Sequence, residues 1–431
     1  MVAKFVWEVP ARIVLPLDGL LARGRMLVTR AGPRPGQPQL ALVNLATGET
    51  MWAVDLPSDI QALHTTDDAL VTAIGDKVLG LAHADGNTLW EQPLKGMLDR
   101  GWTTTPFFQQ IQWFRDLGAA TDGVGGAFLA RNDRVLAKVG TVVYSLDART
   151  GQVHWEQEVG FSLGFPLTAA GDRVLAATSD NGLIALNSDT GDVEWARAEL
   201  ARVSPIYVLG DDLYCADTQV HYRLDPDTGE TLWTAKVPSG MGERLYRVED
   251  RLVLQRPHDI SVIVRDTGEV AGTAQTAPQA SAVGRDCVFY HAPQGDLYCT
   301  SVANVETKWH QPPTGAGAGR MFVAGDVLVT LAPGLVQAFS AETGKSLWAR
   351  KAGPGRLWDT STWASDDRTA YVHDADMLCG YALHGGAHVV QMQGRFFFVH
   401  YMRVMNDTLY LHSGKPAEES IGAAPLKGGE G

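Results

Sequence analysis

The chain has 431 residues and a formal net charge of −13, with 45% apolar residues. The excess of carboxylates argues against nonspecific binding to nucleic acid, and it favours a soluble protein or a basic partner. The sequence has no apolar run of about eighteen residues, the length that would indicate a membrane-spanning helix, and Met1–Lys4 leads straight into a strand pattern. We therefore expect a cytoplasmic protein without a membrane span, unless a leader has been removed.

The main feature along the chain is a recurring motif, Thr-Gly followed by three residues and Trp, which first occurs at Thr47–Trp52. Its glycine position recurs at 48, 86, 151, 191, 229, 268, 305, 344 and 386, with Val305 in place of glycine and with steps near forty except one. Such a period in a strand-rich sequence is typical of the blades of a β-propeller. The tryptophans of the motif are Trp52, Trp90, Trp155, Trp195, Trp233, Trp309 and Trp348.

The long step in the repeat contains an insertion over 95–126. Thr105, Pro106 and Gly118 are suited to begin and end a helix, and apolar residues recur between them at helical spacing. This helix is either a docking element or lid, or a surface helix that packs on its own blade. Trp, Phe and Arg are enriched at interface hot spots, so the docking interpretation selects a set of partner-binding candidates. They are Trp102, Phe107, Phe108, Trp113, Phe114 and Arg115.

The interior of each repeat predicts antiparallel hairpins. In one repeat, the apolar runs Val174–Thr178 and Leu183–Leu186 flank the turn residues Ser179–Gly182, and a second turn follows at Asn187–Gly191. Glycine supplies a positive φ for the second turn, and the Asn or Asp four residues earlier can bond to the turn backbone. The Trp then lies on the outer strand, where it can fill the seam between blades while its N–H binds a carbonyl. The motif is therefore predicted to be structural rather than catalytic.

The segment Leu146–Trp155, which reads Leu-Asp-Ala-Arg-Thr-Gly-Gln-Val-His-Trp, resembles the pyrroloquinoline-quinone-like repeat. That repeat builds the propellers of quinoprotein dehydrogenases and of the non-enzymatic propeller lipoprotein of the outer-membrane β-barrel assembly machinery. The resemblance covers nearly the whole chain and implies an all-β propeller. It does not choose between the functions, because one fold hosts many.

The two ends of the chain are predicted to build one further unit. Three strands of a further blade are predicted, at Phe396–Met402, Thr408–His412 and Ile421–Leu426, but no fourth strand follows them. The sequence around Phe5 and Trp7 matches the outer-strand pattern. An N-terminal closure strand removes exposed sheet edges. We therefore expect a single propeller over 1–431 with about ten four-stranded blades, or eight, since propellers commonly have four to eight. The tail over 416–431 is expected to be mobile towards its end.

A second irregular stretch lies at 353–363 and contains Trp358 and Trp363. In a connection rich in Gly and Pro, these tryptophans either line a face of the propeller or pack in the core of a degenerate blade.

The sequence lacks the motifs of catalysis. The enzymes implied by the resemblance bind quinone and Ca²⁺ and commonly carry a vicinal disulfide, but no two cysteines are adjacent here. Cys287 and Cys299 fall on consecutive predicted strands, where a disulfide is conceivable, yet free thiols are expected without an export signal. His384 and His388 have helical metal-site spacing without the surrounding motif. We therefore predict no catalytic residue, cofactor, metal or small-molecule ligand.

Two functions remain open. The first is a non-enzymatic scaffold that binds a protein partner, as a subunit of a larger assembly. The alternative is a quinone- or carbohydrate-dependent enzyme that uses the central channel.

Overall fold

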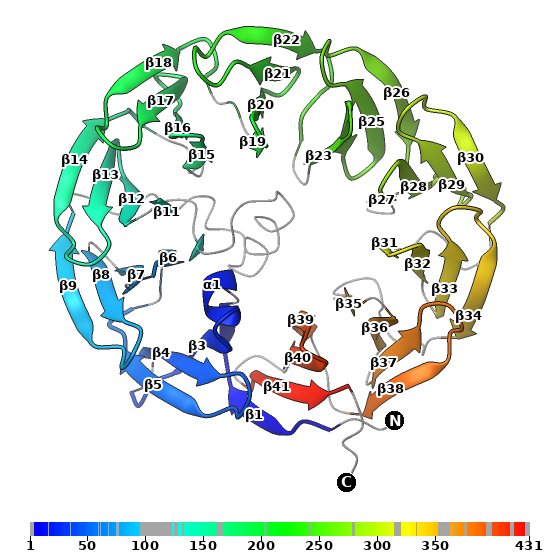
Figure 1. The fold of residues 1–431 in the computed structure, drawn as a ribbon, viewed down its shortest axis with the longest axis horizontal. Helices are drawn as coiled ribbons and strands as arrows, with labels where there is room; N and C mark the ends of the chain where they lie inside the picture. Colours follow the sequence, from blue (N-terminus) through cyan, green and yellow to red (C-terminus); the bar gives the residue numbers. More distant parts are fainter. Residues whose placement is uncertain are drawn as a thin grey trace. The chain divides into compact units, whose positions relative to one another are not determined.

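Ten antiparallel sheets, the blades of a β-propeller, make up nearly all of the regular structure in the computed structural model (Figure 1). We number the blades 1 to 10 in chain order. This confirms the all-β fold and the expected count of ten. The structure describes residues 4–15, 17–34, 36–58, 60, 62–67, 69–74, 77–94, 123–124, 128–131, 133–161, 167–201, 203, 205–240, 243–277, 281–313, 320–332, 334–351, 363–366, 368–374, 377–393, 399–413 and 418–426.

The blades fall into two compact units, one of them Ile13–Gly240 and the other Met1–Arg12 with Met241–Gly431. Each unit contains five sheets. The strands of the first unit, grouped by blade, are β2 (Ile13–Leu15), β3 (Arg25–Ala31), β4 (Pro38–Asn44) and β5 (Thr50–Asp55); β6 (Ala62–Thr65), β7 (Ala69–Ile74), β8 (Lys77–Ala82), β9 (Thr88–Pro93) and β10 (Gly123–Val124); β11 (Phe128–Arg131), β12 (Arg134–Val139), β13 (Val142–Asp147) and β14 (Val153–Glu158); β15 (Thr168–Ala170), β16 (Arg173–Ala177), β17 (Leu183–Asn187) and β18 (Val193–Arg197); β19 (Ile206–Leu209), β20 (Asp212–Ala216), β21 (His221–Leu224) and β22 (Thr231–Ala235).

The second unit holds blades 6 to 10. Its strands are β23 (Arg244–Val248), β24 (Arg251–Gln255), β25 (Asp259–Val264) and β26 (Val270–Gln275); β27 (Ser281–Val283), β28 (Cys287–His291), β29 (Leu297–Ser301) and β30 (Thr307–Gln311); β31 (Arg320–Ala324), β32 (Val327–Ala332), β33 (Leu335–Ser340) and β34 (Ser346–Lys351); β35 (Trp363–Ser365), β36 (Thr369–Asp374), β37 (Met377–Ala382) and β38 (His388–Gln393); β39 (Val399–Met405), β40 (Thr408–Ser413) and β41 (Ser420–Pro425) with β1 (Trp7–Pro10).

Burial follows the position of a strand within its blade. Middle strands such as β7 and β32 are buried along their whole length, whereas the outer strand β14 alternates between half-buried and exposed residues. Neighbouring blades of a unit enclose an apolar cluster, such as the one shared by blades 4 and 5. A strand that is buried on both faces has a continuous run of apolar residues, whereas an outer strand alternates between residues that face the core and residues that face solvent.

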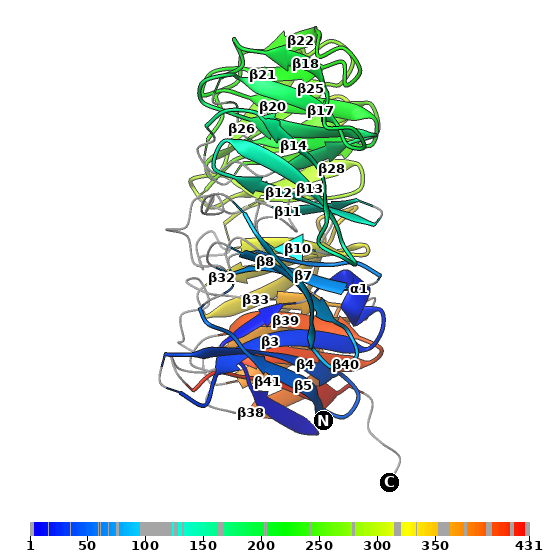
Figure 2. The same ribbon diagram turned by 90° about the vertical axis from the view of Figure 1, so that its left-hand side faces the viewer.

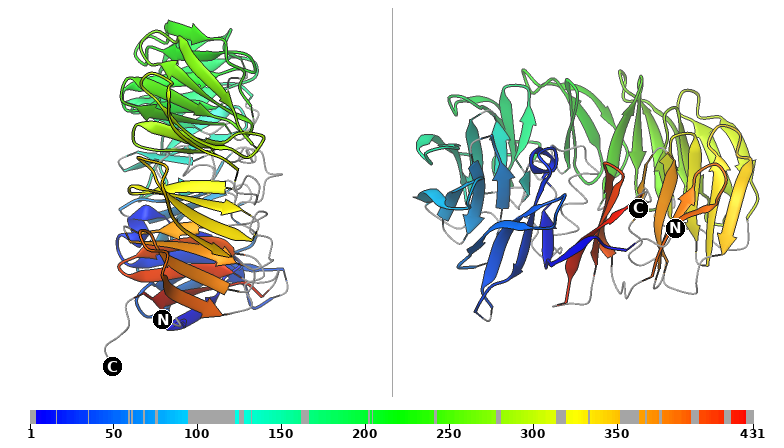
Figure 3. Two further views of the ribbon diagram at one scale, coloured as in Figure 1. Left: turned by 90° about the vertical axis from the view of Figure 1, so that its right-hand side faces the viewer. Right: turned by 60° about the horizontal axis from the view of Figure 1, so that its bottom comes forward.

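The N-terminal strand completes blade 10, as predicted. β1 pairs antiparallel with β41, with Trp7 opposite Ala423, and the dark-blue strand lies beside the red ones in Figure 3. β41 itself falls inside the range 416–431 that was expected to form a mobile tail, so at least Ser420–Pro425 is regular structure. The paired strand satisfies backbone groups that a free edge would expose.

Two small elements were not anticipated. The one-turn helix α1 (Asp18–Leu21) lies against blade 1, where Leu20 joins the apolar cluster of blades 1 and 2 (Figure 2). β10, from the end of the insertion, adds a fifth strand to blade 2 by pairing with β6. The helix expected within the insertion lies outside the described residues.

A β-bulge precedes the Trp position in blades 1 to 9. In blade 4, for example, Ala185 pairs with Trp195 but the next residue, Leu186, pairs with Val193, which leaves Glu194 as the extra residue. The same shift occurs at the corresponding position of the other eight sheets. Bulges bend a strand and redirect its side chains, so this one sets the direction of the Trp that follows it.

Candidate functional site

A repeated contact, which we call the blade latch, joins the Trp of one blade to the glycine turn of the next blade in the same unit. Between blades 4 and 5, the Trp195 Nε1 donates to the Pro226 carbonyl at 3.0 Å. A Cβ atom added to Gly229 would lie 2.6 Å from the indole ring, so the ring occupies the space that a side chain would need. The same pair of contacts joins Trp52 to His83 and Gly86, Trp90 to Ala148 and Gly151, Trp155 to Ser188 and Gly191, Trp309 to Ala341 and Gly344, and Trp348 to Leu383 and Gly386.

The glycine of the latch is thus required for two separate reasons. Gly191 has φ +80° and its added Cβ would lie 2.6 Å from the Trp155 ring. The sequence predicted the positive φ but not the contact with the preceding blade. The tryptophans themselves are buried or, for Trp155 and Trp309, half-buried.

We expect Gly191→Ala to lower the free energy of unfolding by about 2–4 kcal/mol. An L residue in the left-handed region costs about 1–2 kcal/mol, and displacement of the Trp155 ring adds a packing cost of about 1–2 kcal/mol. Urea denaturation measures the sum. Gly171→Ala in the same blade is the matched control, because Gly171 has φ +60° and nothing within 4 Å of its added Cβ. An equal loss of stability in both variants would show that the contact with the Trp155 ring does not contribute to the effect.

A second donor strengthens some latches. Two residues after the Trp, Arg197 donates to the Gly229 carbonyl, Gln311 donates to the Gly344 carbonyl at 3.0 Å, and Arg350 donates to the Gly386 carbonyl at 2.8 Å. These donors were missed from the sequence. A long side chain with an N–H donor at this fixed offset is the pattern that would have found them.

The Asn or Asp four residues before the glycine organises the turn. Asp147 accepts hydrogen bonds from the backbone N–H groups of Arg149 and Thr150 and from the Thr150 hydroxyl, at 2.8–2.9 Å. Burial alone would raise the pKa of Asp147, but these hydrogen bonds outweigh it and hold the pKa below its ordinary value. Asn44, Asn187 and Asp225 bond to their turns in the same way, which confirms the predicted turn bonding.

The depressed pKa of Asp147 implies that its contribution to stability is lost in acid. A carboxyl whose pKa is lower in the folded state stabilises the protein above its unfolded pKa, about 3.9, and loses that effect as the pH falls further. We expect Asp147→Asn, which keeps an acceptor without the charge, to be less stable than wild type at pH 7 and to approach it below about pH 4. Urea denaturation at both pH values measures this difference. A difference that grows on acidification would contradict the assignment.

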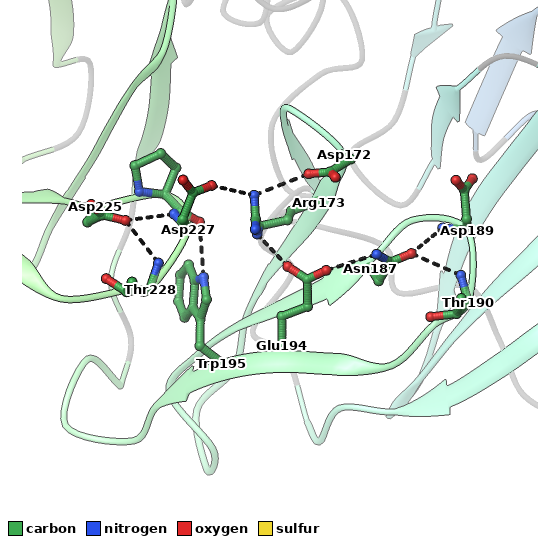
Figure 4. Close-up of polar contacts among 11 residues, drawn as sticks. Asp172, Arg173, Asn187, Asp189, Thr190, Glu194, Trp195, Asp225, Asp227 and Thr228 are labelled. Carbon is green, nitrogen blue, oxygen red and sulfur yellow. Dashed lines mark hydrogen bonds and ion pairs between the residues drawn. The ribbon is translucent and has the colours of Figure 1, made fainter.

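Arginines at the start of the second strand connect neighbouring turns. Figure 4 shows Arg173 between Glu194 of its own blade and Asp227 of the next, at 2.5 and 2.8 Å, with Asp172 at 3.1 Å. Glu194 in turn accepts from Asn187 at 2.8 Å, so a continuous polar chain runs from one turn to the next. Arg134 and Arg251 reach the following turn through the carbonyls of Asp189 and Ala303.

At a seam within the second unit, both the Trp and the glycine of the latch are replaced. Between blades 6 and 7, Gly272 stands at the Trp position and Val305 stands at the glycine position. A Cβ on Gly272 would lie 2.5 Å from the Val305 side chain, and Val305 itself has φ +59°. The valine side chain therefore fills the place of the missing indole. A β-branched residue at positive φ is a strained conformation, so this filling has a conformational cost.

The tryptophans and closure residues outside those latches occupy structural positions. Trp233 is buried with its ring centroid 5.9 Å from that of Tyr214. Phe5 covers Gly422 of β41, and the Trp7 ring lies 6.1 Å from that of Tyr410. These two residues of the N-terminal segment therefore pack against blade 10.

The remaining candidates are only partly placed. All six partner-binding candidates of the insertion, from Trp102 to Arg115, lie outside the described residues, and so does Trp358. Trp363 stacks on Phe322 at a centroid distance of 3.9 Å while remaining 39% exposed. His384 lies 3.4 Å from Asp326, in an exposed ion pair of the kind expected for a surface residue.

Phe161, in the connection after β14, is an exposed aromatic residue with a fixed backbone. Its side chain is 56% exposed. Its N–H donates to Asp180, and its carbonyl accepts from the N–H and the hydroxyl of Ser179 at 2.8 and 3.1 Å. A large apolar side chain on an ordered backbone loses little conformational entropy on binding, which is a property of interface anchors.

The outer turns of blades 1 to 5 are acidic. Each of them carries at least one carboxylate, and Arg149 is the one Lys or Arg among them. In these described turns the carboxylates are Glu49, Asp85, Asp147, Asp189, Asp192, Asp225, Asp227 and Glu230. Within the part of the chain that the structure describes, no helix has both the length and the hydropathy needed to span a bilayer. Nor do the described side chains form a group of three or more His, Cys, Asp or Glu suited to a metal ion.

The sequence matches a known protein family. The family model described as outer membrane protein assembly factor BamB matches residues 99–264 and again 216–395. Among solved structures, the chain is similar to BamB from Moraxella catarrhalis, with 17% identity over 69% of this chain and 95% of that one and a TM-score of 0.41. It is also similar to the computationally designed Ika8 protein, with 14% identity over the same shares and a TM-score of 0.43. No curated protein matches the sequence.

Proposed function

Since the chain belongs to the family described as outer membrane protein assembly factor BamB, we propose that it is a non-enzymatic scaffold that binds a protein partner within a larger assembly. One observation carries this proposal. The polar and aromatic residues of the repeat are used in contacts between blades, as the Trp195, Arg197 and Arg173 contacts illustrate. The motif that labels the family therefore builds a rigid frame, and partner recognition falls to residues outside the motif.

Phe161 and the insertion over 95–126 are the proposed contact residues. Phe161 is exposed on a hydrogen-bonded backbone, and the insertion interrupts the repeat while its end is fixed to blade 2 through β10. An anchor held on a rigid element makes a more specific contact than one on a free loop. The acidic outer turns and the net charge of −13 favour a partner with a basic surface.

The proposal includes a cytoplasmic location. It is supported by four cysteines that are all free thiols, since disulfides are rare in reducing compartments.

Affinity capture with the full-length protein tests this function. We expect wild type to retain a defined set of proteins that is lost when residues 95–126 are replaced by a short Gly/Ser linker and is weakened when Phe161 is changed to Asp. Leu232→Asp, at a 52% exposed residue of the outer strand β22, is the matched surface control. Raising the salt concentration is expected to weaken capture, because exposed charges are screened beyond about 10 Å at 0.1 M salt.

Two results would contradict the proposal. One is an unchanged set of retained proteins in both variants. The other is dye-linked alcohol oxidation by the purified protein supplied with quinone and Ca²⁺, which would identify an enzyme that uses the channel.

A further inference from the structure

Two of the four cysteines form a pair in blade 7. Cys287 lies opposite Ser301 and Cys299 lies opposite Phe289, so the two cysteines are diagonal neighbours on the same face of strands β28 and β29. Both belong to the apolar cluster between blades 7 and 8. Cys299 is fully buried whereas Cys287 is 5% exposed, so only Cys287 borders solvent.

The surroundings make the two thiols unequal. The neighbouring Cys299 thiol lowers the pKa of Cys287, against the opposing effects of burial and of the Asp286 carboxylate, and the Lys308 ammonium also lowers it. The neighbouring Cys287 thiol, together with burial, raises the pKa of Cys299. Lys308 is held over this site by Asp286, at 2.5 Å. Thiolates are the reactive form of cysteine, and a nearby cation favours them.

We propose that Cys287 and Cys299 are a modification site at which a hydroperoxide forms an intramolecular disulfide. The Cys287 thiolate attacks the peroxide oxygen, the O–O bond breaks, and Cys287 becomes a sulfenic acid while the released oxygen leaves as water or alcohol after protonation. The sulfur of Cys299 then attacks the sulfenic sulfur, the S–O bond breaks and a second water leaves with the Cys299 proton. Two thiols are oxidised by two electrons and one peroxide is reduced.

The diagonal position makes this disulfide reversible. Diagonal residues of an antiparallel pair have Cβ atoms about 7 Å apart, whereas a disulfide requires about 3.5–4.5 Å. Closing the bond must therefore shift β28 along β29, and strained disulfides are easily reduced.

The strand shift would reach the latch of blade 7. Cys299 is the register partner of Trp309, and the Phe289 ring lies 5.8 Å from the Trp309 ring. Trp309 donates to the Ala341 carbonyl of blade 8 at 2.9 Å. Oxidation is thus expected to weaken this one seam.

Peptide mapping of the native full-length chain tests the proposal. The chain is exposed to hydrogen peroxide at neutral pH, its remaining thiols are alkylated, and it is digested with trypsin. Asp286–Lys308 contains both cysteines and no internal Lys or Arg, so the disulfide appears as the unalkylated peptide lacking two hydrogens. Cys215, whose pKa burial raises to about 12, and the buried Cys379 are internal controls in other peptides.

We expect the Asp286–Lys308 peptide to lose two hydrogens at least about tenfold faster than the control cysteines react, since reactivity follows thiolate content and exposure. A thiol reductant restores it. Cys299→Ser is expected to stop at a sulfenic acid that a cyclic 1,3-diketone traps. Lys308→Leu is expected to slow the reaction, which is followed in this variant on the longer tryptic peptide Asp286–Arg320. It is expected to leave the fold intact, because Leu89, Leu232 and Leu347 occupy the same bulge position in other blades. Equal rates at all four cysteines, disulfides between chains, or a Lys308→Leu rate equal to wild type would overturn the proposal.

Discussion

Replacing Trp195 with Ala is expected to lower the free energy of unfolding by about 3–5 kcal/mol, the range observed when a large buried aromatic side chain is truncated. The indole packs on Gly229 and donates to the Pro226 carbonyl at 3.0 Å. Truncation opens a cavity at the seam between blades 4 and 5 and leaves the carbonyl without its donor. Urea denaturation of the purified variant measures the loss.

Two controls separate the parts of this effect. Trp195→Phe keeps a ring but removes the donor, so its expected loss is about 1–3 kcal/mol, the cost of an unsatisfied buried polar group. Leu232→Ala removes an exposed side chain from the outer strand β22, and its effect is expected to stay within about 0.5 kcal/mol. A Trp195→Ala protein as stable as Leu232→Ala would show that the latch does not hold the blades together.

The seam between blades 6 and 7 gives the second large effect. Gly272→Trp alone is expected to destabilise the protein by about 1–3 kcal/mol or more, the cost of overpacking, because even the added Cβ meets the Val305 side chain at 2.5 Å. Val305→Gly alone relieves the strain of φ +59° but leaves an unfilled seam. The double variant recreates the Trp and Gly pair that forms the latch at six other seams.

A double-mutant cycle measures this coupling. We expect the double variant to be more stable than the sum of the single effects by about 1–3 kcal/mol, within the range for residues in direct contact. Additive effects would mean that the two positions do not contact each other.

Much of the fold was predictable because it repeats. The nine glycine positions, with one further unit built from the two chain ends, predicted about ten blades, with eight as the alternative. The match between Phe5–Pro10 and an outer strand predicted the pairing of β1 with β41. Repetition makes each local pattern visible several times, so a weak turn or strand pattern gains support from its copies.

Contacts between repeats were harder to predict. The sequence shows that Gly191 needs a positive φ but not that Trp155 of the preceding blade covers it. The bulge before the Trp and the reach of Arg173 to the next turn depend on strand pairing and on the spacing of the blades. These are long-range relations that no local window of sequence contains.

The candidate site was less predictable than the fold. Phe161 gave no pattern in the sequence, because its value as an anchor comes from exposure and from hydrogen bonds to Asp180 and Ser179. The closeness of Cys287 and Cys299 was foreseeable from their consecutive strands. Lys308, whose charge lowers the pKa of both thiols, lies on a third strand, so its place beside them was not.

Partner capture by a latch variant and a surface variant tests most directly whether the repeat motif is structural and the binding surface is separate from it. Trp195→Phe and Phe161→Asp are measured side by side for the amount of each protein that they retain, and each is first shown to be folded by circular dichroism. We predict that Trp195→Phe retains the wild-type set in full despite its lower stability, whereas Phe161→Asp retains clearly less of it despite a wild-type stability. Loss of the set in Trp195→Phe with full retention in Phe161→Asp would contradict the division between a structural motif and a separate binding surface.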